Sequence, residues 1–278
     1  MDRPIVIGAV AYDPRVVPIW EGMRDYFRAA GPPIDYVLFS NYDSQVQALL
    51  NRQIDIAWNT NLAWVKAQRR TGGTCRALAL RDVDANFTSI LVARTDSGVR
   101  SLADVRGKRV ALGSADSAQA AILPIHFLRQ SGIDAERECK LLRFDLDVGK
   151  HGDTGTSELE VLKALRDNQA DVGVLGDATW AKQLAEGKVD PNKIRAFWTS
   201  PGYCHCNFTV LADFPEDLGR AWTNSLVAMP YDDPKWRELM DLEGLKRWLP
   251  ANAAIMKGYD ILFEAAEQQG LFERWGTP

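Results

Sequence analysis

Short apolar strands alternate with amphipathic helices along most of this chain, and the alternation limits the folds that it can adopt. The first part predicts strands at 5–12, 34–39 and 54–58, with helices from Pro14 to about residue 30 and at 42–50. The order then repeats, with a short helix, a turn and a strand over 101–112, further strands at 138–144 and 171–175, and helices at 118–129 and 157–167. This pattern predicts an α/β fold with parallel sheets covered on both faces.

The tripeptide Asn-Phe-Thr occurs twice, each time beside a run that favours a strand. It stands at 86–88 and again at 207–209, and apolar residues follow both copies. We interpret the two segments as strands that cross between two lobes, with only helices after the second. The expected first lobe is 1–88 plus 208–278 and the second is 92–200, with hinge strands near 87–93 and 203–211.

Charge and composition exclude several classes of partner. A net charge of -4 over 278 residues gives no general attraction to nucleic acid or to an anionic membrane surface. No apolar run approaches the roughly 20 residues of a membrane-spanning helix, so we expect no membrane insertion. The chain begins without a leader sequence, which predicts a cytoplasmic protein, or a periplasmic one if a leader has been removed. Cys204 and Cys206 are too close for an easy mutual disulfide, which favours a reducing compartment.

Polar residues follow the predicted strands, where open α/β sheets bind their ligands. In the first lobe the candidates are Tyr12, Asn59, Thr60 and Asn61. In the second lobe they are Ser114, Asp116, Ser117, Gln119, His151, Asp153 and Thr154. Small hydroxylic residues before a helix present hydroxyls and backbone N–H groups to an anion, although Ser114 and Ser117 would serve equally as helix N-caps. The loop around His151 is predicted to bind ligand rather than to be only a solvated surface loop.

Cys204-His205-Cys206 is the one segment whose residue types suggest metal binding. On a strand the two cysteines would face one way and His205 the other, and the spacing matches no common zinc motif. Buried cysteines with His205 and Tyr203 near the ligand are therefore the preferred interpretation, with no metal. The sequence contains no recognisable nucleotide loop or catalytic motif, so we expect no cofactor and assign no catalytic residue.

Residues 101–111, Ser-Leu-Ala-Asp-Val-Arg-Gly-Lys-Arg-Val-Ala, are similar to a segment of type II periplasmic binding proteins. Further matches are Tyr42-Asp43, the run at 54–58, Gly149-Lys150-His151 and the run at 170–173. Across roughly residues 4 to 265 the chain resembles the phosphate/phosphite/phosphonate-binding proteins of ABC transporters. The resemblance implies two α/β lobes joined by two crossing strands that close over a small ligand, and a partner permease if the protein is exported.

The resemblance also assigns residues to the site. It places the anion-contacting loop on Asp116-Ser117-Ala118-Gln119, the cleft histidine on His151, an aromatic wall on Tyr12 and Tyr42, and an acidic contact on Asp177. The family's Ser-Thr-Ser is Ser-Ala-Gln here, with Asp116 in front.

Two functions remain open at this stage. The first is a monomeric solute-binding protein that traps a small polar or anionic molecule, such as a phosphonate, by hinge closure. The alternative is a cytoplasmic enzyme on the same fold that resembles thiamine-pyrimidine precursor synthases. In that enzyme His151 or His205 would act together with Cys204 or Cys206 as metal ligand or nucleophile.

Overall fold

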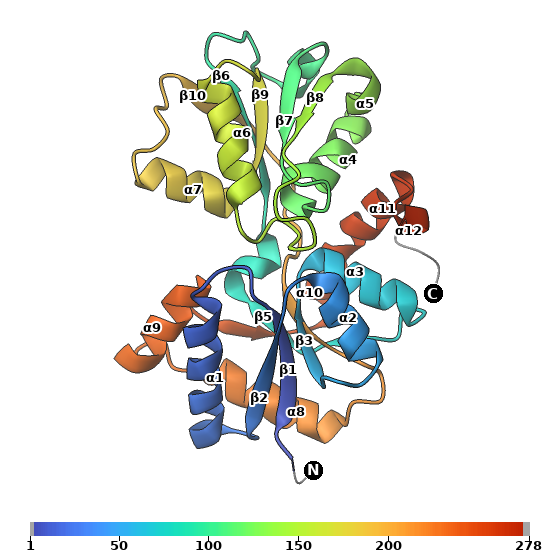
Figure 1. Ribbon diagram of the computed structural model, residues 1–278, viewed down its shortest axis with the longest axis vertical. Coiled ribbons are helices and arrows are strands. Elements are labelled where there is room, and N and C mark those ends of the chain that lie inside the picture. The colour runs from blue at the N-terminus through green and yellow to red at the C-terminus, as the bar shows by residue number, and fades with distance from the viewer. Residues whose placement is uncertain (1–2, 275–278) are drawn as a thin grey trace. The chain divides into compact units, whose positions relative to one another are not determined.

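The computed structural model describes residues 3–274, which form two compact units (Figure 1). Within the described residues, unit 1 comprises 3–86 and 203–260, and unit 2 comprises 87–202 and 261–274. The chain thus passes from one unit to the other after Asn86, after Gly202 and after Asp260. The sequence suggested two such passages, and the structure has a third.

Unit 1 contains a five-stranded mixed sheet in the order β2-β1-β3-β11-β4. Its strands are β1 (Ile5–Val10), β2 (Ile34–Phe39), β3 (Ile56–Asn59), β4 (Arg76–Ala77) and β11 (Asn207–Val210). β1 runs parallel to β2 and β3, whereas β11 runs antiparallel to both β3 and β4. In this sheet the expected parallel arrangement therefore holds only for β1, β2 and β3, because β11 joins after the chain has passed through unit 2.

The helices of unit 1 follow the alternation expected at its N-terminal end. They are α1 (Val16–Ala30), α2 (Tyr42–Leu50), α3 (Asn61–Arg70), η1 (Asp82–Asn86), α8 (Glu216–Val227), α9 (Pro234–Glu243), α10 (Ala253–Met256) and η4 (Lys257–Tyr259). A short strand, β12 (Trp248–Pro250), pairs antiparallel with β5 (Ala79–Arg81). The expectation of helices alone after the second crossing was therefore wrong. Leu249 lies in register with Leu80, and Trp248 is buried in the core.

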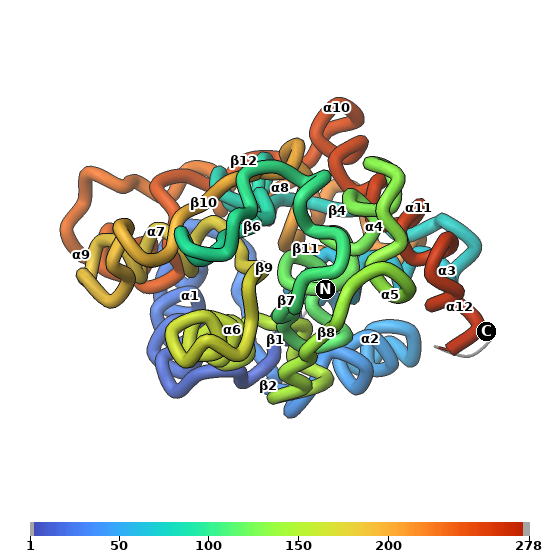
Figure 2. Tube along the Cα trace, turned by 90° about the horizontal axis from the view of Figure 1, so that it is seen from above, coloured from blue at the N-terminus to red at the C-terminus, as the bar shows by residue number. Residues whose placement is uncertain are grey.

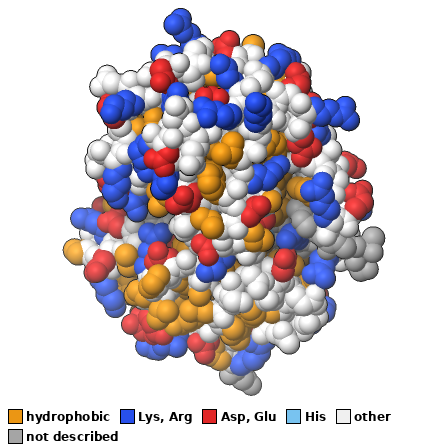
Figure 3. Space-filling view, turned by 45° about the horizontal axis from the view of Figure 1, so that its top comes forward, with side chains coloured by type: hydrophobic (Ala, Val, Ile, Leu, Met, Phe, Trp, Pro, Cys, Tyr) orange, Lys and Arg blue, Asp and Glu red, His pale blue; other side chains and the backbone are white. Residues whose placement is uncertain are grey.

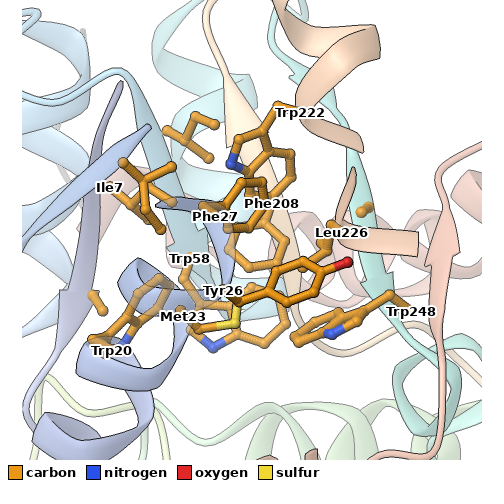
Figure 4. Close-up of a cluster of buried hydrophobic side chains, with 14 of the residues drawn as sticks. Ile7, Trp20, Met23, Tyr26, Phe27, Trp58, Phe208, Trp222, Leu226 and Trp248 are labelled. Atoms are coloured by element: carbon orange, nitrogen blue, oxygen red, sulfur yellow. The ribbon is translucent and has the colours of Figure 1, made fainter. Parts of the chain in front are cut away.

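The core of unit 1 is rich in aromatic side chains (Figure 4). Phe27 of α1 stacks on Trp222 of α8, with ring centroids 5.4 Å apart and an angle of 8° between the planes. Phe208 of β11 meets Trp222 at 4.7 Å and Trp58 of β3 at 4.4 Å. Each buried aromatic removes about 150–250 Å² from water, so these contacts hold the returning strand β11 against the N-terminal elements.

Unit 2 contains a second five-stranded mixed sheet, in the order β10-β6-β9-β7-β8. Its strands are β6 (Ser89–Arg94), β7 (Arg109–Leu112), β8 (Lys140–Arg143), β9 (Val172–Gly176) and β10 (Ile194–Thr199). β7 is parallel to β8 and β9, and β6 is antiparallel to β9 and β10. The sequence suggested that the segments of β6 and β11 cross between the lobes. In the structure β6 pairs with strands of unit 2 and β11 with strands of unit 1. The chain changes unit just before each of them, after Asn86 and after Gly202.

Helices cover both faces of the sheet of unit 2. They are η2 (Leu102–Val105), the π-helical η3 (Ala118–Ile122), α4 (Leu123–Gln130), α5 (Ala135–Glu138), α6 (Thr156–Arg166) and α7 (Asp177–Ala185). Figure 2 shows the five strands in their sheet order, with α4 and α6 on opposite sides of the row. Successive residues of a strand point to opposite faces of the sheet, and each face has its own hydrophobic core. Leu91 of β6 packs in the same core as Ile125 of α4, whereas its neighbour Ile90 packs in the core that contains Val161 of α6.

Helix α11 (Asp260–Gln268) begins at the last residue of the unit 1 segment and continues in unit 2, which also contains α12 (Leu271–Arg274). His126 Nδ1 lies 2.7 Å from Gln268 Oε1, and Gln269 Nε2 donates to the Ile122 carbonyl at 2.9 Å. These bonds explain why 261–274 belong to unit 2, although the sequence-based division put 208–278 in the first lobe. Residues 275–278 lie outside the described part of the chain.

The surface carries charges of both signs. On the face seen in Figure 3, Lys and Arg side chains are interspersed with Asp and Glu side chains. Within residues 3–274, no helix has both the length and the apolar character that crossing a membrane requires.

Candidate ligand-binding residues

A group of buried polar side chains lies at the carboxyl ends of β7 and β9 in unit 2. We call it the polar cluster, and it consists of Ser114, Ser117, Gln119, His151, Ser157 and Glu158. Each of these residues exposes 4% of its surface or less. Four of the six were candidates from sequence.

The loop between β7 and η3 uses its serines to fix its own shape. Ser117 is the N-cap of η3, and its Oγ accepts from the Ala120 N–H at 3.2 Å. Ser114 Oγ instead donates to the Leu146 carbonyl at 2.6 Å, which ties this loop to the next one. A helix N-terminus carries a partial positive charge, so η3 presents Ser117 and Gln119 where an anion is favoured.

Glu158 and Gln119 connect three elements of the polar cluster. Gln119 Nε2 donates to Glu158 Oε1 at 3.2 Å, and Glu158 Oε2 accepts from the Gly176 N–H at 2.9 Å. Sequence reasoning gave Glu158 no role in the site. The only local signal was an acidic residue in the first turn of a helix, which is common because it complements the helix dipole. The hydrogen bond that ties Glu158 to β9 comes from Gly176, which is 18 residues away in the sequence.

The loop at 144–155, between β8 and α6, lies directly on Ser117 and Gln119. A Cβ added to Gly152 would be 2.5 Å from Ser117 Oγ and 2.8 Å from Gln119 Nε2. Gly152 has φ +85°, and the neighbouring His151 has φ +53°, which is rare for a residue with a side chain. His151 is 1% exposed. The surrounding packing therefore holds His151 in a strained backbone conformation, as often occurs in ligand-binding loops.

Two acidic candidates of unit 2, Asp116 and Asp177, make specific structural bonds. Asp116 Oδ2 accepts from the Gly149 N–H at 2.6 Å and fixes the middle of the 144–155 loop. Asp177 Oδ2 accepts from both the N–H and the hydroxyl of Thr88, at 3.0 and 2.9 Å. Asp153 and Thr154 are half-buried in the same loop, and Thr154 Oγ1 accepts from the Thr156 N–H at 3.2 Å.

The amide candidates of unit 1 form hydrogen bonds with other residues of unit 1. Asn59 accepts from Gln45 Nε2 at 2.8 Å and donates to Thr209 Oγ1 at 3.0 Å. Asn61 Nδ2 donates to the Cys204 carbonyl at 3.2 Å. Thr60 is the N-cap of α3. Asn59 and Asn61 therefore join β3 and α3 to the segment that returns from unit 2.

The aromatic candidates of unit 1 differ in exposure. Tyr42 and Tyr203 are each 1% exposed, so their rings are part of the interior of unit 1. Tyr12 is half-buried and packs against the aromatic core at the end of β1. Of the three, Tyr12 is the most accessible.

A second buried polar group surrounds Asp84 in unit 1. Arg81 Nε donates to Asp84 Oδ2 at 2.7 Å, and Arg81 Nη2 donates to Oδ1 at 2.9 Å. Burial raises the pKa of the Asp84 carboxyl, but the charge and hydrogen bonds of Arg81 outweigh it and hold that pKa well below its usual value. Arg81 also donates to a Glu243 carboxylate oxygen at 3.2 Å.

His205 and Cys206 lie beside this ion pair. His205 Nδ1 is 3.0 Å from Cys206 Sγ and 3.6 Å from Asp84 Oδ1. The sequence analysis placed residues 203–211 on a strand, which would point His205 away from the cysteines. In the structure β11 begins only at Asn207, so residues 204–206 do not alternate as a strand does. Asp84, His205 and Cys206 together offer three donor atoms that could hold a metal ion.

The two α/β units, each with a mixed five-stranded sheet, have the architecture of periplasmic binding proteins. Residues 8–255 match the family model described as "ABC transporter, phosphonate, periplasmic substrate-binding protein". The chain therefore belongs to this family of substrate-binding proteins, as its sequence motifs suggested.

One curated relative is the probable ABC transporter phosphite-binding protein PhnD1 of Prochlorococcus marinus (strain MIT 9301). It is 22% identical over 237 residues, which cover 82% of this chain and 76% of the relative. The solved structure of PhnD1 with methylphosphonate has a TM-score of 0.73 at 20% identity, covering 96% of this chain and 99% of that one.

Two further solved structures share the fold. A Xanthomonas citri protein bound to ATP has a TM-score of 0.74 at 18% identity, covering 95% of this chain and 97% of that one. The aliphatic sulphonate-binding protein SsuA of Escherichia coli has a TM-score of 0.66 at 14% identity, covering 98% and 94%. These likenesses confirm the α/β binding-protein fold.

Membership of the family decides between the two functions that the sequence left open. Its members are periplasmic proteins that bind a small ligand and work with an ABC permease. Solute binding is thus the function that the comparisons support, and none of the relatives described above is named as a thiamine-precursor synthase.

Proposed function

We propose that this protein binds a small phosphonate-like oxyanion and that the polar cluster of unit 2 supplies part of its site. The observation that carries the proposal is the junction of Ser117, Gln119 and Gly152 at the N-terminus of η3. It places a hydroxyl, an amide and a glycine backbone side by side at a helix end that favours negative charge.

The burial of this junction strengthens its preference for an anion. Hydrogen bonds to a charged group are roughly twice as strong as neutral ones, and a low local dielectric increases their strength. Ser117 is 0% and Gln119 is 4% exposed, so a ligand contacting them would be withdrawn from water. His151, on the same loop as Gly152, would add an imidazole donor.

Calorimetric titration tests this proposal directly. Phosphite, phosphate, methylphosphonate and a short alkanesulfonate are added in turn to the purified protein, and at least one is expected to bind stoichiometrically. Ser117→Ala is expected to weaken that binding by roughly 10- to 150-fold, since a hydrogen bond to a charged group contributes about 1.5–3 kcal/mol. Failure of all four ligands to bind would contradict the proposal.

Ser101→Ala is the matched control for the loss of a serine cap. Ser101 lies at the N-cap of η2 in the same unit, and its hydroxyl donates to Asp104 at 2.9 Å. Its loss should lower stability without changing oxyanion affinity. Tyr12→Phe and Tyr42→Phe, titrated in the same way, decide whether these residues of unit 1 contact the solute.

We further propose that the protein acts as a monomer in the periplasm and delivers its solute to a permease. The family's description and its relatives support this role. Light scattering after gel filtration tests the monomer, and fractionation of the producing cells tests the location.

A further inference from the structure

Three potential metal ligands of different chemistry meet inside unit 1. Asp84 comes from η1, while His205 and Cys206 come from the segment just before β11. Asp84 is 0%, Cys206 2% and His205 4% exposed. None of them belongs to the polar cluster, and the proposed oxyanion binding uses none of them.

The donor atoms are close enough to share one ion. His205 Nδ1 lies 3.0 Å from Cys206 Sγ and 3.6 Å from Asp84 Oδ1, and all three donors lie within 4.8 Å of one another. Zinc bonds of about 2.0 Å to nitrogen and about 2.3 Å to sulfur place neighbouring tetrahedral ligands about 3.5 Å apart. The two separations from His205 Nδ1, 3.0 Å to Cys206 Sγ and 3.6 Å to Asp84 Oδ1, lie on either side of this value, so modest side-chain adjustments would bring the donors around one ion.

Hydrogen bonds with one another and with surrounding residues already orient the three residues that carry these donor atoms. Asp84 Oδ1 accepts from the Cys206 N–H at 3.1 Å, while its backbone carbonyl accepts from the His205 N–H at 2.9 Å. Arg81 holds both carboxylate oxygens, and Tyr259 Oη donates to the Cys206 carbonyl at 3.0 Å. Metal ligands are commonly fixed in this way by a second layer of hydrogen bonds.

A divalent ion would offset negative charge in this group. The two carboxylates Asp84 and Glu243 are both paired with Arg81. Binding through a Cys206 thiolate would add a further negative charge beside them. Buried charge is stable only when it is compensated, so the cation would have an electrostatic role as well as a geometric one.

We propose that Asp84, His205 and Cys206 form a structural site for a divalent transition-metal ion, with zinc preferred. Sulfur and imidazole donors select such ions over magnesium and calcium, which prefer oxygen. The nearly complete burial indicates a structural role. The ion would hold η1 to the segment that returns to unit 1 at β11.

Cobalt(II) provides the direct test, because a cobalt–thiolate bond gives a charge-transfer band in the near ultraviolet. Since the site is buried, Co²⁺ is offered both to the folded protein and during refolding from urea. The expected result is one equivalent bound, a thiolate band, and displacement of Co²⁺ by Zn²⁺. No binding in either procedure, or binding without the thiolate band, would overturn the proposal.

Two serine variants locate the sulfur ligand. Cys206→Ser should abolish the band and weaken Zn²⁺ binding by more than the roughly 10–100-fold that loss of an outer partner causes. Cys204→Ser, a change at a buried cysteine outside the donor set, should retain both. A band that survives in Cys206→Ser refutes the assignment. Should that variant fail to fold, X-ray absorption of the Zn²⁺-loaded natural chain must show one sulfur and one imidazole ligand, and their absence refutes it equally.

Discussion

Gly152 and Ser117 approach so closely that only glycine fits at position 152. A Cβ there would lie 2.5 Å from Ser117 Oγ, a distance that real Cβ atoms essentially never show. Gly152 also has φ +85°, which disfavours any other residue. The 144–155 loop and the cap of η3 are thus fitted to each other, and a change in one must move the other.

Gly152→Ala is expected to destabilise the protein and to weaken oxyanion binding. The left-handed backbone costs about 1–2 kcal/mol for a residue with a Cβ, and crowding against Ser117 adds about 1–3 kcal/mol. Urea unfolding and calorimetry measure the two effects. Gly155→Ala is the matched control, because Gly155 has φ +68° in the same loop but nothing within 4 Å of an added Cβ. Equal losses in both variants would show that the Ser117 contact is unimportant.

Glu158→Gln is expected to tighten binding of a phosphonate-like oxyanion by about tenfold, or 1.4 kcal/mol, since it removes a like charge from the polar cluster. Stability should fall by about 1–3 kcal/mol, because the bonds from Gln119 and Gly176 lose their charged acceptor. Calorimetry at neutral pH measures the affinity. Glu160→Gln removes the same charge from the same helix outside the polar cluster and should change affinity little. Weaker binding by Glu158→Gln would mean that the carboxylate accepts a hydrogen bond from the ligand.

The Asp84–Arg81 pair predicts a loss of stability in acid. The pKa of Asp84 in the folded protein lies below its usual 3.8, because Arg81 overcomes the effect of burial. Its contribution is therefore present above about pH 4 and is lost as the pH falls further. Asp84→Asn should lower the free energy of unfolding at pH 7 by about 3–5 kcal/mol, since it leaves Arg81 buried without its main partner.

Urea unfolding between pH 7 and pH 3 measures this effect. The natural chain should lose more stability over that range than Asp84→Asn does. Asp82→Asn, a half-buried neighbour in η1, should keep the full pH dependence. Parallel pH profiles for the natural chain and Asp84→Asn would contradict the assigned pKa direction.

Cys204 is expected to resist alkylation in the folded protein. Burial and the nearby Asp84 carboxylate raise the pKa of its thiol to about 12, so little thiolate is present at pH 8. Iodoacetamide labelling followed by peptide mass spectrometry should find Cys139, which is only partly buried, modified well before Cys204. Unfolding in urea should make the two rates similar. Rapid labelling of Cys204 in the folded state would disprove the prediction.

Local sequence patterns predicted most elements because helix and strand periodicities are short-range properties. The helix at 42–50 and the strand at 34–39 have the expected bounds, since their apolar residues repeat at the spacing of each element. The same patterns placed Ser114, Ser117 and Gln119 beyond the end of β7. The phosphonate-binding family was suggested instead by the resemblance of motifs such as residues 101–111, and the family model confirms it.

The tertiary structure alone decided which distant segments meet. Asp84 receives the Cys206 N–H from 122 residues away, and Asn59 bonds Thr209 from 150 residues away. No local period encodes such pairs, because they arise only when β11 inserts beside β3 in the sheet of unit 1. The sequence by itself therefore determined the order of strands and helices and the polar loops between them. Burial of those elements against distant partners determined the mixed sheets, the assignment of 261–274 to unit 2 and the group around Asp84.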